Sequence, residues 1–372
     1  MGKGMKVMFL VFHTIVAHSG ISKKILAQVE GLRQNGAEVS LCSLVIAPDG
    51  RKYRALDSRP ICEFGGGLKA KIRKRVDYSD IVESAVEGGY DLIYIRYDIN
   101  ADPFTVRMMK MLHQSGIRTI VEIPTYPYDG EFRGQGLMMN LQLAIDKLFR
   151  RRFFSYCDRI VLYSGPSSLH GRPVVHISNG VDFSSVPLSQ DRNSFHGSLK
   201  LLSVANIHLW HGLDRLIRGM AEHKDIDCEL HIVGDGVPQI IESYRTLAES
   251  LGIADKVKIL GPMYGKDLDR EFGWANMAVG SLGRHRSGIT SIKTLKNREY
   301  AARGLAFFYS EQDEDFDNAP YVMKVPADES AIDVKALGEF LSGLKMSGEE
   351  IRQSIRNLSW TAQMARIIES IS

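Results

Sequence analysis

Cysteine, long apolar runs and an excess of one charge are all scarce in this chain of 372 residues. Its cysteines are far apart and form no CxxC pair, which argues against a zinc site or a disulfide framework and fits a reducing cytoplasm. They are Cys42, Cys62, Cys157 and Cys228. No apolar stretch approaches the roughly 20 residues that a membrane span needs. The net charge of only +3 gives no case for a dedicated nucleic-acid binder.

The chain also lacks GxGxxG, the fingerprint of a dinucleotide-binding domain, because the loop after its first apolar run has a single glycine, Gly20. The order of elements is nevertheless that of a doubly wound α/β domain. A strand at 5–12 precedes a helix that closes at Gly36 and a strand at 38–45. A second α/β set starts at 200–205, and its strands are nearly all apolar, as in a parallel sheet. A chain of this length fits two such domains.

Many candidate binding residues are concentrated in the segment 283–309, GRHRSGITSIKTLKNREYAARGLAFFY. It predicts a loop, a helix from about Lys293 that stops at Gly304, and a buried strand. The unpaired N–H groups of the helix N-terminal half favour an anion. Many bases beside one carboxylate indicate a ligand with phosphate and hydroxyl groups, such as a sugar nucleotide. These residues are Arg284, His285, Arg286, Lys296, Arg298 and Glu299.

The run LKNREYAARGLAFFYS resembles the signature of family 4 retaining glycosyltransferases, which have the two-domain GT-B fold. In that family a glutamate precedes an alanine- and glycine-rich turn and an apolar strand, and here that glutamate is Glu299. The resemblance implies that Glu299 holds the nucleotide ribose. In the family pattern Glu299 corresponds to the second of two glutamates, and the first lies eight positions earlier, where this chain has Ser291. The group that contacts the donor sugar there is left open.

The resemblance implies two Rossmann-like parallel-sheet domains that face a central cleft. The N-terminal, acceptor-side domain would span 1–182, and the nucleotide-sugar domain would span 183–358. The final helix, 359–372, would cross back to the first domain. The implied activity is metal-independent, retaining transfer of a sugar from a nucleoside-diphosphate sugar to a hydroxyl of a glycan or lipid-linked glycan, in polysaccharide or glycoconjugate biosynthesis. We expect no cofactor beyond that co-substrate.

A second group of candidates lies after the strand at 200–205. Family members have an arginine and a lysine there that contact the donor diphosphate, and these positions are Asn206 and His211 in this chain. A phosphate at the following helix would meet the N–H of Gly212, His211 and Arg215. The turn Gly234-Asp235 resembles the family's strand end beside the nucleotide. The alternative for the histidines is packing beside a tryptophan at a domain edge.

The first domain offers weaker candidates. The loop residues His18, Ser19 and Gly20 are placed for the donor phosphate or the acceptor. Glu122 ends a predicted strand, and the carboxyl ends of parallel strands border the crevice of such a sheet. Asp129 or Glu131 could act as a base. A turn rich in prolines and charges is an equal alternative.

Two basic segments allow contact with a membrane. The run KAKIRKR at 69–75 precedes a predicted polar helix, and IDKLFRRRFF at 145–154 mixes aromatic and basic residues at helical spacing. Both could lie on an anionic surface, although a solvated basic helix face is a simpler explanation. We expect a cytoplasmic protein, with the inner face of the cell membrane as one alternative.

Two other functions fit the same architecture. One is a nucleotide-sugar epimerase. The other is a non-catalytic partner of another transferase, because Ser291, Asn206 and His211 depart from the family pattern. The sequence does not identify the sugar, the base, the acceptor or the oligomeric state.

Overall fold

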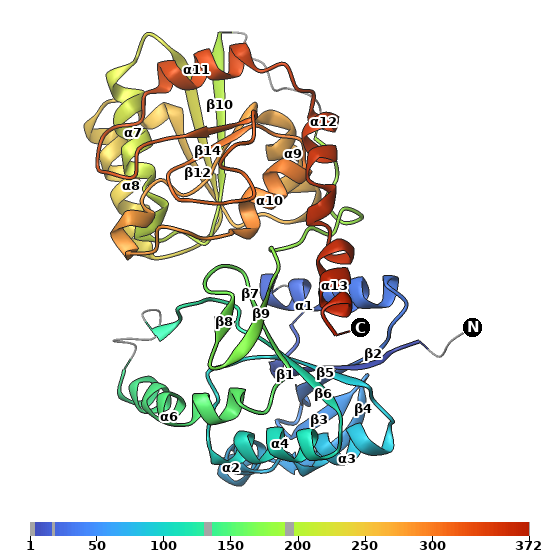
Figure 1. Cartoon of the computed structure of the whole chain (residues 1–372). Helices are drawn as coiled ribbons and strands as arrows, with labels where there is room; N and C mark the ends of the chain where they lie inside the picture. Colours follow the sequence, from blue (N-terminus) through green and yellow to red (C-terminus); the bar gives the residue numbers. More distant parts are fainter. Residues whose placement is uncertain (1–3, 17–18, 130–135, 190–196, 372) are drawn as a thin grey trace. The chain divides into compact units, whose positions relative to one another are not determined.

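The computed structural model describes residues 4–16, 19–129, 136–189 and 197–371. They fall into two compact units (Figure 1). Unit 1 comprises Met1–Ile177 with Trp360–Ser372, and unit 2 comprises Ser178–Ser359. The predicted domains, 1–182 and 183–358, place the corresponding boundaries after Asp182 and after Leu358. His18 and Glu131, two of the predicted candidates, lie outside the described residues.

Unit 1 is built on a sheet in the order β4-β3-β2-β1-β5-β6-β7-β9-β8. The central strand β1 is parallel to β2 and to β5, and its residues Val7 to Leu10 are fully buried. An apolar run without alternation is expected for a strand that is covered on both faces. The strands are β1 (Lys6–Thr14), β2 (Glu38–Ile46), β3 (Lys52–Leu56), β4 (Arg59–Gly65), β5 (Leu92–Arg96), β6 (Arg118–Glu122), β7 (Arg159–Leu162), β8 (Ser168–Leu169) and β9 (Arg172–His176).

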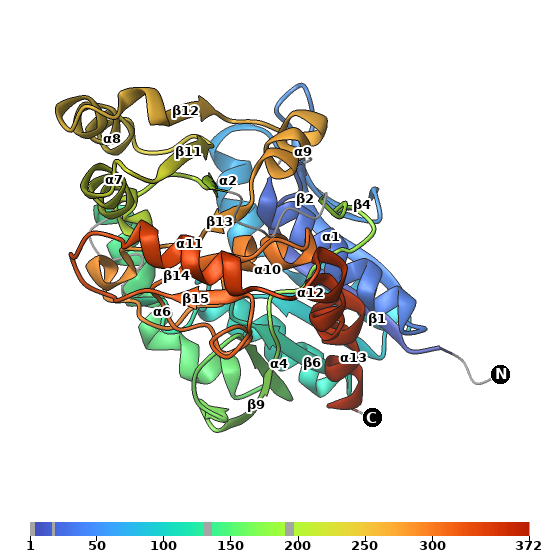
Figure 2. The ribbon, with the colours of Figure 1, turned by 90° about the horizontal axis from the view of Figure 1, so that it is seen from above.

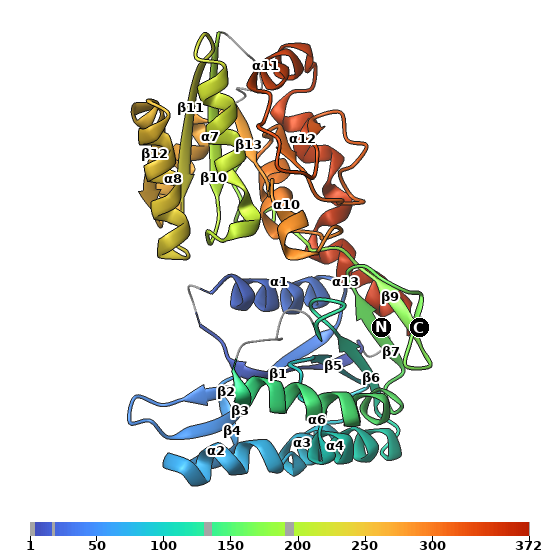
Figure 3. The same cartoon turned by 90° about the vertical axis from the view of Figure 1, so that its left-hand side faces the viewer.

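Helices cover both faces of this sheet. Figure 3 shows α1 and α13 on one face and α2, α3, α4 and α6 on the other. Two apolar clusters of unit 1 correspond to these two faces. The helices are α1 (Gly20–Gln34), α2 (Gly67–Val76), α3 (Ser79–Glu87), α4 (Pro103–Gln114), α6 (Leu137–Phe154) and α13 (Trp360–Glu369).

The last helix, α13, belongs to unit 1 although it follows unit 2 in the sequence. It packs closely on α1: a Cβ on Gly31 would lie 2.7 Å from the carbonyl oxygen of Trp360. Asn35 Nδ2 donates to the carbonyl of Thr361 at 2.8 Å. Met364 is fully buried in the cluster beneath α1. Unit 1 is therefore completed by the C-terminal end of the described chain.

Three parts of unit 1 differ from the sequence-based expectation. The hairpin β3–β4 was not expected, because its turn at Asp57 and Ser58 has no glycine. Both residues nevertheless have positive φ, 46° and 72°, as a two-residue hairpin turn requires. The basic run 69–75 lies inside α2 and not before a helix. Helix α6 begins at Leu137 and not at Ile145.

Unit 2 has a six-stranded sheet in the order β12-β11-β10-β13-β14-β15. Figure 2 shows β12 and β11 on one side of β13, and β14 and β15 on the other. All neighbouring strands are parallel. Counted along the chain this order is 3-2-1-4-5-6, the doubly wound arrangement in which ligands bind where the order reverses. That point lies between β10 and β13. The strands are β10 (Ser198–Val204), β11 (Asp227–Val233), β12 (Val257–Gly261), β13 (Met277–Val279), β14 (Phe307–Tyr309) and β15 (Val322–Lys324).

The helical segments of unit 2 surround one large apolar cluster. Helix α7 shows how the sequence produces them, because its apolar residues Leu213, Leu216, Ile217 and Met220 recur every three or four positions and are all buried. The segments are η1 (Leu209–His211), α7 (Leu213–Glu222), α8 (Pro238–Ser250), η2 (Ala254–Lys256), α9 (Gly265–Trp274), η3 (Arg284–Ser287), α10 (Leu295–Ala302), α11 (Val334–Gly343), α12 (Gly348–Ser354) and η4 (Arg356–Leu358).

Candidate functional site

The candidate site lies in unit 2, at the carboxyl ends of β10, β13 and β14. The turn η1 follows β10 and the turn η3 follows β13, so the two turns flank the point where the strand order reverses. They are joined by backbone hydrogen bonds. Leu282 N donates to the carbonyl of His211 at 2.9 Å, and Gly283 N donates to that of Trp210 at 3.1 Å. The segment 283–309 and the second group of candidates, His211 and Gly212, which were predicted separately, are therefore in contact.

Gly212 makes this contact possible. Its φ is +61°, and a Cβ there would lie 2.6 Å from the backbone nitrogen of Gly283. An L side chain would be strained by the conformation and would also collide with the neighbouring turn. Gly234 is similar, because a Cβ would lie 1.8 Å from the carbonyl oxygen of Ala205. The two glycines thus allow two backbone segments of the protein to pack closely. The sequence had instead predicted that they lie against a ligand.

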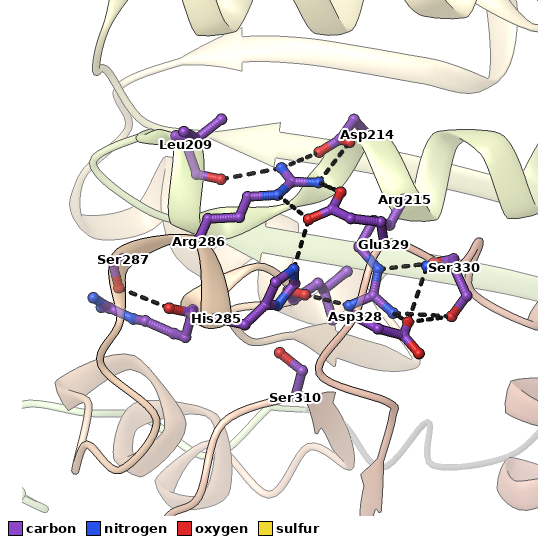
Figure 4. A network of polar contacts seen from close by, with 12 residues as sticks. Leu209, Asp214, Arg215, His285, Arg286, Ser287, Ser310, Asp328, Glu329 and Ser330 are labelled. Atoms are coloured by element: carbon purple, nitrogen blue, oxygen red, sulfur yellow. Dashed lines mark hydrogen bonds and ion pairs between the residues drawn. The ribbon is translucent and has the colours of Figure 1, made fainter.

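Arg286 clamps the two turns together (Figure 4). Its guanidinium donates to both carboxylate oxygens of Asp214 on α7, at 2.8 and 2.9 Å, and its Nε donates to Glu329 at 2.9 Å. These hydrogen bonds, first with Glu329 and then with Asp214, raise the pKa of Arg286. His285 Nε2 lies 2.6 Å from the same carboxylate of Glu329. Both Arg286 and His285 were predicted to bind the donor. In the structure their side chains are paired with carboxylates, and these pairs fix the shape of the site.

Arg215 and Arg298 point into unit 2 and are fully buried. Arg215 donates from Nε to the carbonyl of Ser330 at 2.7 Å and from Nη1 to the carbonyl of Leu282. Arg298 is paired with the carboxylates of Asp313 and Asp315. Both guanidinium groups are buried among protein partners, in contrast to the donor-binding role predicted for the two residues. They hold the loops beneath the site.

Lys296 has the opposite environment, although it lies two positions before Arg298 on α10. Its ammonium is buried and has no hydrogen-bond partner among the described residues. Burial lowers its pKa to about 7, an effect that Glu311 opposes and Arg284 adds to. A buried ammonium without a partner is costly in the free protein. An anion that reached it would restore the missing interactions.

Glu311 is the functional candidate that sequence reasoning missed. It follows β14 by two residues and is only 2% exposed. Neither carboxylate oxygen has a hydrogen-bond partner in the described part of the chain, and burial raises its pKa. The available signal was an acidic residue just past the end of a buried strand in an α/β domain. The hydroxyls of Ser281 and Thr294 and the Nδ1 of His285 are also buried there, with no hydrogen-bond partner among the residues that the structure describes.

His211 is buried in a way that defines its protonation. Its Nδ1 accepts the backbone N–H of His208 at 2.9 Å, so that nitrogen carries no proton. Burial, with the nearby charges of Lys296 and Arg284, lowers its pKa to about 2. The ring is neutral, and any proton on it lies on Nε2, which makes no hydrogen bond within the described residues. His211 can therefore donate a neutral hydrogen bond but does not replace a lysine as a cation.

Aromatic rings border the same region. The rings of His208 and Trp210 are stacked, with centroids 4.3 Å apart and planes 8° apart. The guanidinium of Arg284 lies over the Trp210 ring, 5.3 Å from its centroid, as in a cation–π contact. Arg284 thus brings positive charge close to Lys296 and His211, since it lowers the pKa of both.

The remaining candidates in unit 2 are closer to solvent. Glu299 lies on α10 with its side chain 34% exposed and pairs with Arg303 at 3.1 Å. Arg303 also donates to Asp269 at 2.7 Å. The other three predicted residues, Asn206, Asp235 and Ser291, are exposed.

The first-domain candidates occupy a different unit. Glu122 is fully buried and is surrounded by Gln28, Tyr94, Arg96, Tyr163 and Lys24. Burial opposes its ionisation, but the charges of Lys24 and Arg96 and the hydrogen bonds prevail and lower its pKa to about 2. A buried carboxylate with so many partners within unit 1 stabilises the unit, in contrast to the place beside the sheet crevice that was predicted for it.

The segment after Glu122 does line a cavity of about 160 Å³, with Ile123, Pro124 and Thr125 on its wall. Asp129, beyond it, is bound by Arg150 at 2.8 Å and Lys147 at 3.2 Å. The Arg150 hydrogen bond lowers the pKa of Asp129, so it is a weak base in this state. Gly20 is the first residue of α1.

The described residues contain neither a membrane-spanning helix nor a metal-binding cluster. None of their helices combines the length and apolar character needed to cross a bilayer. No group of three or more histidine, cysteine, aspartate or glutamate side chains in the described ranges is placed to hold a metal ion.

Comparison with known proteins identifies the fold. No family model and no curated sequence matches the chain. Sucrose-phosphate synthase of Thermosynechococcus elongatus has a similar structure, with a TM-score of 0.65 and 14% identity over 99% of this chain and 98% of that one. HepE of Anabaena, crystallised with UDP, has a TM-score of 0.61 and 14% identity over 99% of both chains. The chain thus has the two-domain GT-B fold of nucleotide-sugar glycosyltransferases.

The same fold also occurs in another class of enzyme. A putative UDP-N-acetylglucosamine 2-epimerase from Listeria monocytogenes has a TM-score of 0.55 and 12% identity over 98% of this chain and 96% of that one. At these identities the similarity defines architecture, and the activity has to be argued from the site.

Proposed function

We propose that the protein is a glycosyltransferase that moves a sugar from a nucleoside-diphosphate sugar to a hydroxyl, with retention at the anomeric carbon. The observation that carries the proposal is the buried ammonium of Lys296, which has no hydrogen-bond partner in the described part of the chain and lies beside η1 and η3, at the point of strand reversal in unit 2. GT-B neighbours such as HepE, crystallised with UDP, support a nucleotide as the ligand class.

Each group has a role in this proposal. Lys296 binds the diphosphate and stabilises the charge that develops on it as its bond to C1 of the sugar breaks. Arg284 adds positive charge, and His211 donates from Nε2. Glu299 binds the ribose hydroxyls, as the family resemblance implies. A new bond forms between C1 and the acceptor oxygen on the same face of the sugar, and the hydroxyl proton is released.

In this proposal Glu311 takes the role of the first glutamate of the family motif. Ser291, which replaces its first glutamate, is exposed, whereas the carboxylate of Glu311 is buried beside Lys296. We propose that Glu311 accepts hydrogen bonds from hydroxyls of the donor sugar. We further propose that side-chain cations meet the diphosphate without a metal ion, and that the acceptor is a glycan or lipid-linked glycan of polysaccharide or glycoconjugate biosynthesis in the cytoplasm.

Calorimetry with UDP, GDP, ADP and their common sugar conjugates tests the donor site. We expect one nucleotide to bind best, and we expect Lys296→Met to weaken its binding at least about tenfold, because a charge-assisted contact is lost. Lys266→Met changes an exposed lysine on α9 and should leave binding unchanged. Equal affinities for wild type and Lys296→Met would overturn the assignment. Transfer that stops on addition of EDTA would contradict the metal-free mechanism.

An epimerase is the second candidate, favoured by the similarity to the putative epimerase of Listeria monocytogenes. The two activities differ in what they need. An epimerase releases an altered nucleotide sugar without an acceptor, whereas a transferase releases free nucleoside diphosphate only as sugar is transferred. Incubation of the purified protein with each donor, followed by chromatography, separates them. A protein that binds no nucleotide at all would be a non-catalytic partner.

A further inference from the structure

Helix α6 carries a row of large apolar side chains that face solvent. Leu137 is 90% exposed and Leu148 is 75% exposed. The spacing of three or four residues places the row along one side of the helix. A row of this length on one helix is unlike the scattered exposed apolar residues that most surfaces carry. Its members are Leu137, Met138, Leu141, Ile145 and Leu148.

Helix α2 has a similar row on the same side of the sheet of unit 1 (Figure 3). Leu68 is 72% exposed, and Ile72 and Val76 follow at intervals of four. Only Ala70 of this helix is buried. The residues between the apolar ones are basic, and no acidic residue occurs in the range 65–76. They are Lys69, Lys71, Arg73, Lys74 and Arg75.

A cavity of about 400 Å³ connects the two helices. Lys74 and Arg75 of α2 line it, as do Met138, Leu141 and Ile145 of α6. The exposed apolar row of α6 thus continues into the cavity wall. Phe12, Tyr78, Phe104 and Leu44 add further apolar surface to its lining, and Arg54, Asp98 and Asp102 contribute charged groups to the same wall.

We propose that unit 1 docks on the surface of an anionic lipid bilayer through α2 and α6. The apolar rows enter the boundary between head groups and acyl chains, and the basic residues of α2, with Arg151 and Arg152 of α6, bind the anionic head groups. The cavity receives the hydrocarbon chain of a lipid. The proposal goes beyond the glycosyl-transfer activity and does not depend on it.

The distribution of charge favours a bilayer over a second copy of the chain. In a two-fold dimer the same patch faces itself, so the basic residues of α2 would meet like charges. A solvated basic face, the simpler explanation, has no reason to carry exposed leucines between its charges. Basic residues combined with an apolar face are the pattern of a helix that lies in an anionic interface.

Vesicle flotation tests the proposal directly, without any nucleotide. Wild type should float with vesicles of phosphatidylcholine and phosphatidylglycerol and should stay below with phosphatidylcholine alone. Binding should fall as salt rises, because about 1 M salt shortens the Debye length to about 3 Å. Absence of binding to the anionic vesicles would overturn the proposal.

Two variants locate the surface. Lys71→Glu with Arg75→Glu should weaken binding at least about 25-fold, since each basic residue near such a surface contributes roughly fivefold. Leu141→Asp should also weaken it. The matched controls, Lys335→Glu on α11 and Leu26→Asp on α1, change exposed residues elsewhere and should bind like wild type. Equal binding by the α2 and α6 variants would assign contact to another surface.

A fluorescent probe tests insertion even if a charged variant folds poorly. The natural tryptophans are Trp210, Trp274 and Trp360, none of which is on α2 or α6. Leu141→Trp should add emission that shifts to shorter wavelength on anionic vesicles and is quenched by lipids with brominated chains. Leu26→Trp should not respond. A Leu141→Trp signal that changes with protein concentration and not with lipid would identify the face as a contact between copies, against the proposal.

Because these measurements need no donor, their failure is distinct from failure of the proposed transferase. If the protein binds nucleotide but not vesicles, the proposed donor site stands and only the proposed docking on a bilayer is overturned.

Discussion

Lys296 and Arg298 show how strongly the surroundings of a single residue decide its role. Both are basic residues on α10, and the sequence treats them alike. Arg298 is fully buried and paired with Asp313 and Asp315. Lys296 has a buried ammonium with no hydrogen-bond partner among the described residues. Arg298 therefore stabilises the fold, whereas the ammonium of Lys296 is free to bind an anion.

Replacement of Arg298 should therefore affect stability. Arg298→Met leaves two carboxylates, one of them fully buried, without their counter-charge, and breaking a buried pair costs about 3–5 kcal/mol. The loss should appear as a lower midpoint in urea denaturation. Lys296→Met should lose no stability, because it removes a charge that burial already disfavours. A small loss for Arg298→Met would contradict the structural role.

The lowered pKa of Lys296 predicts uptake of a proton on ligand binding. At about pH 8 only about a tenth of a group with a pKa of about 7 is protonated. A bound diphosphate favours the ammonium and raises the pKa of Lys296, so nearly one proton should be taken up. Calorimetry in buffers of different ionisation enthalpy measures this. Unchanged uptake in Lys296→Met would assign the proton to another group.

The same shift predicts how stability depends on pH. The pKa of Lys296 is about 7 in the folded protein and 10.5 by its model value. The unfolded state therefore binds more protons between these values, and the free energy of unfolding rises with pH across this window. Relative to Lys296→Met, wild type should gain stability from about pH 7 to about pH 10, as measured by denaturation at several pH values. A parallel pair of curves would refute the shift.

At the scale of elements, the contact between η1 and η3 determines the shape of the site. Gly212→Ala should destabilise the protein by about 1–3 kcal/mol and weaken nucleotide binding, because the αL conformation is strained and the new Cβ displaces Gly283. Gly288→Ala is the matched control, with φ +69° and no atom within 4 Å of the added Cβ. Equal losses of stability and binding in the two variants would show that the turn contact is unimportant.

Elements were the level that the sequence predicted best. Long apolar runs and buried helix faces identify the parallel strands and helices such as α1 and α7, because burial imposes their periodicity. The hairpin β3–β4 was missed, because it turns at Asp57 and Ser58 without a glycine. Helix α6 was expected only over 145–154, and the sequence did not show that its apolar row from Leu137 to Leu148 is exposed.

At the scale of the whole molecule, unit 1 depends on a helix from the far end of the sequence. Met364→Ala in α13 should cost about 2–5 kcal/mol, as for other fully buried methionines. Hydrogen exchange should show lost protection in α1 and β1 but not in β10. Leu337→Ala in α11 should give the reverse pattern. Loss of protection in both units from either variant would mean that they unfold together.

The sequence by itself determined the α/β class, the two Rossmann-like units and the segment that forms the candidate site. These follow from local periodicity and composition. Only the tertiary structure decided which charged side chains are paired within the protein and which are left to bind a ligand. Arg215, Arg286 and Arg298 are balanced by carbonyls or carboxylates distant in sequence, whereas the side chains of Lys296 and Glu311 are buried with no hydrogen-bond partner in the described ranges. Burial and pairing depend on neighbours from other elements, and no local pattern in the chain contains that information.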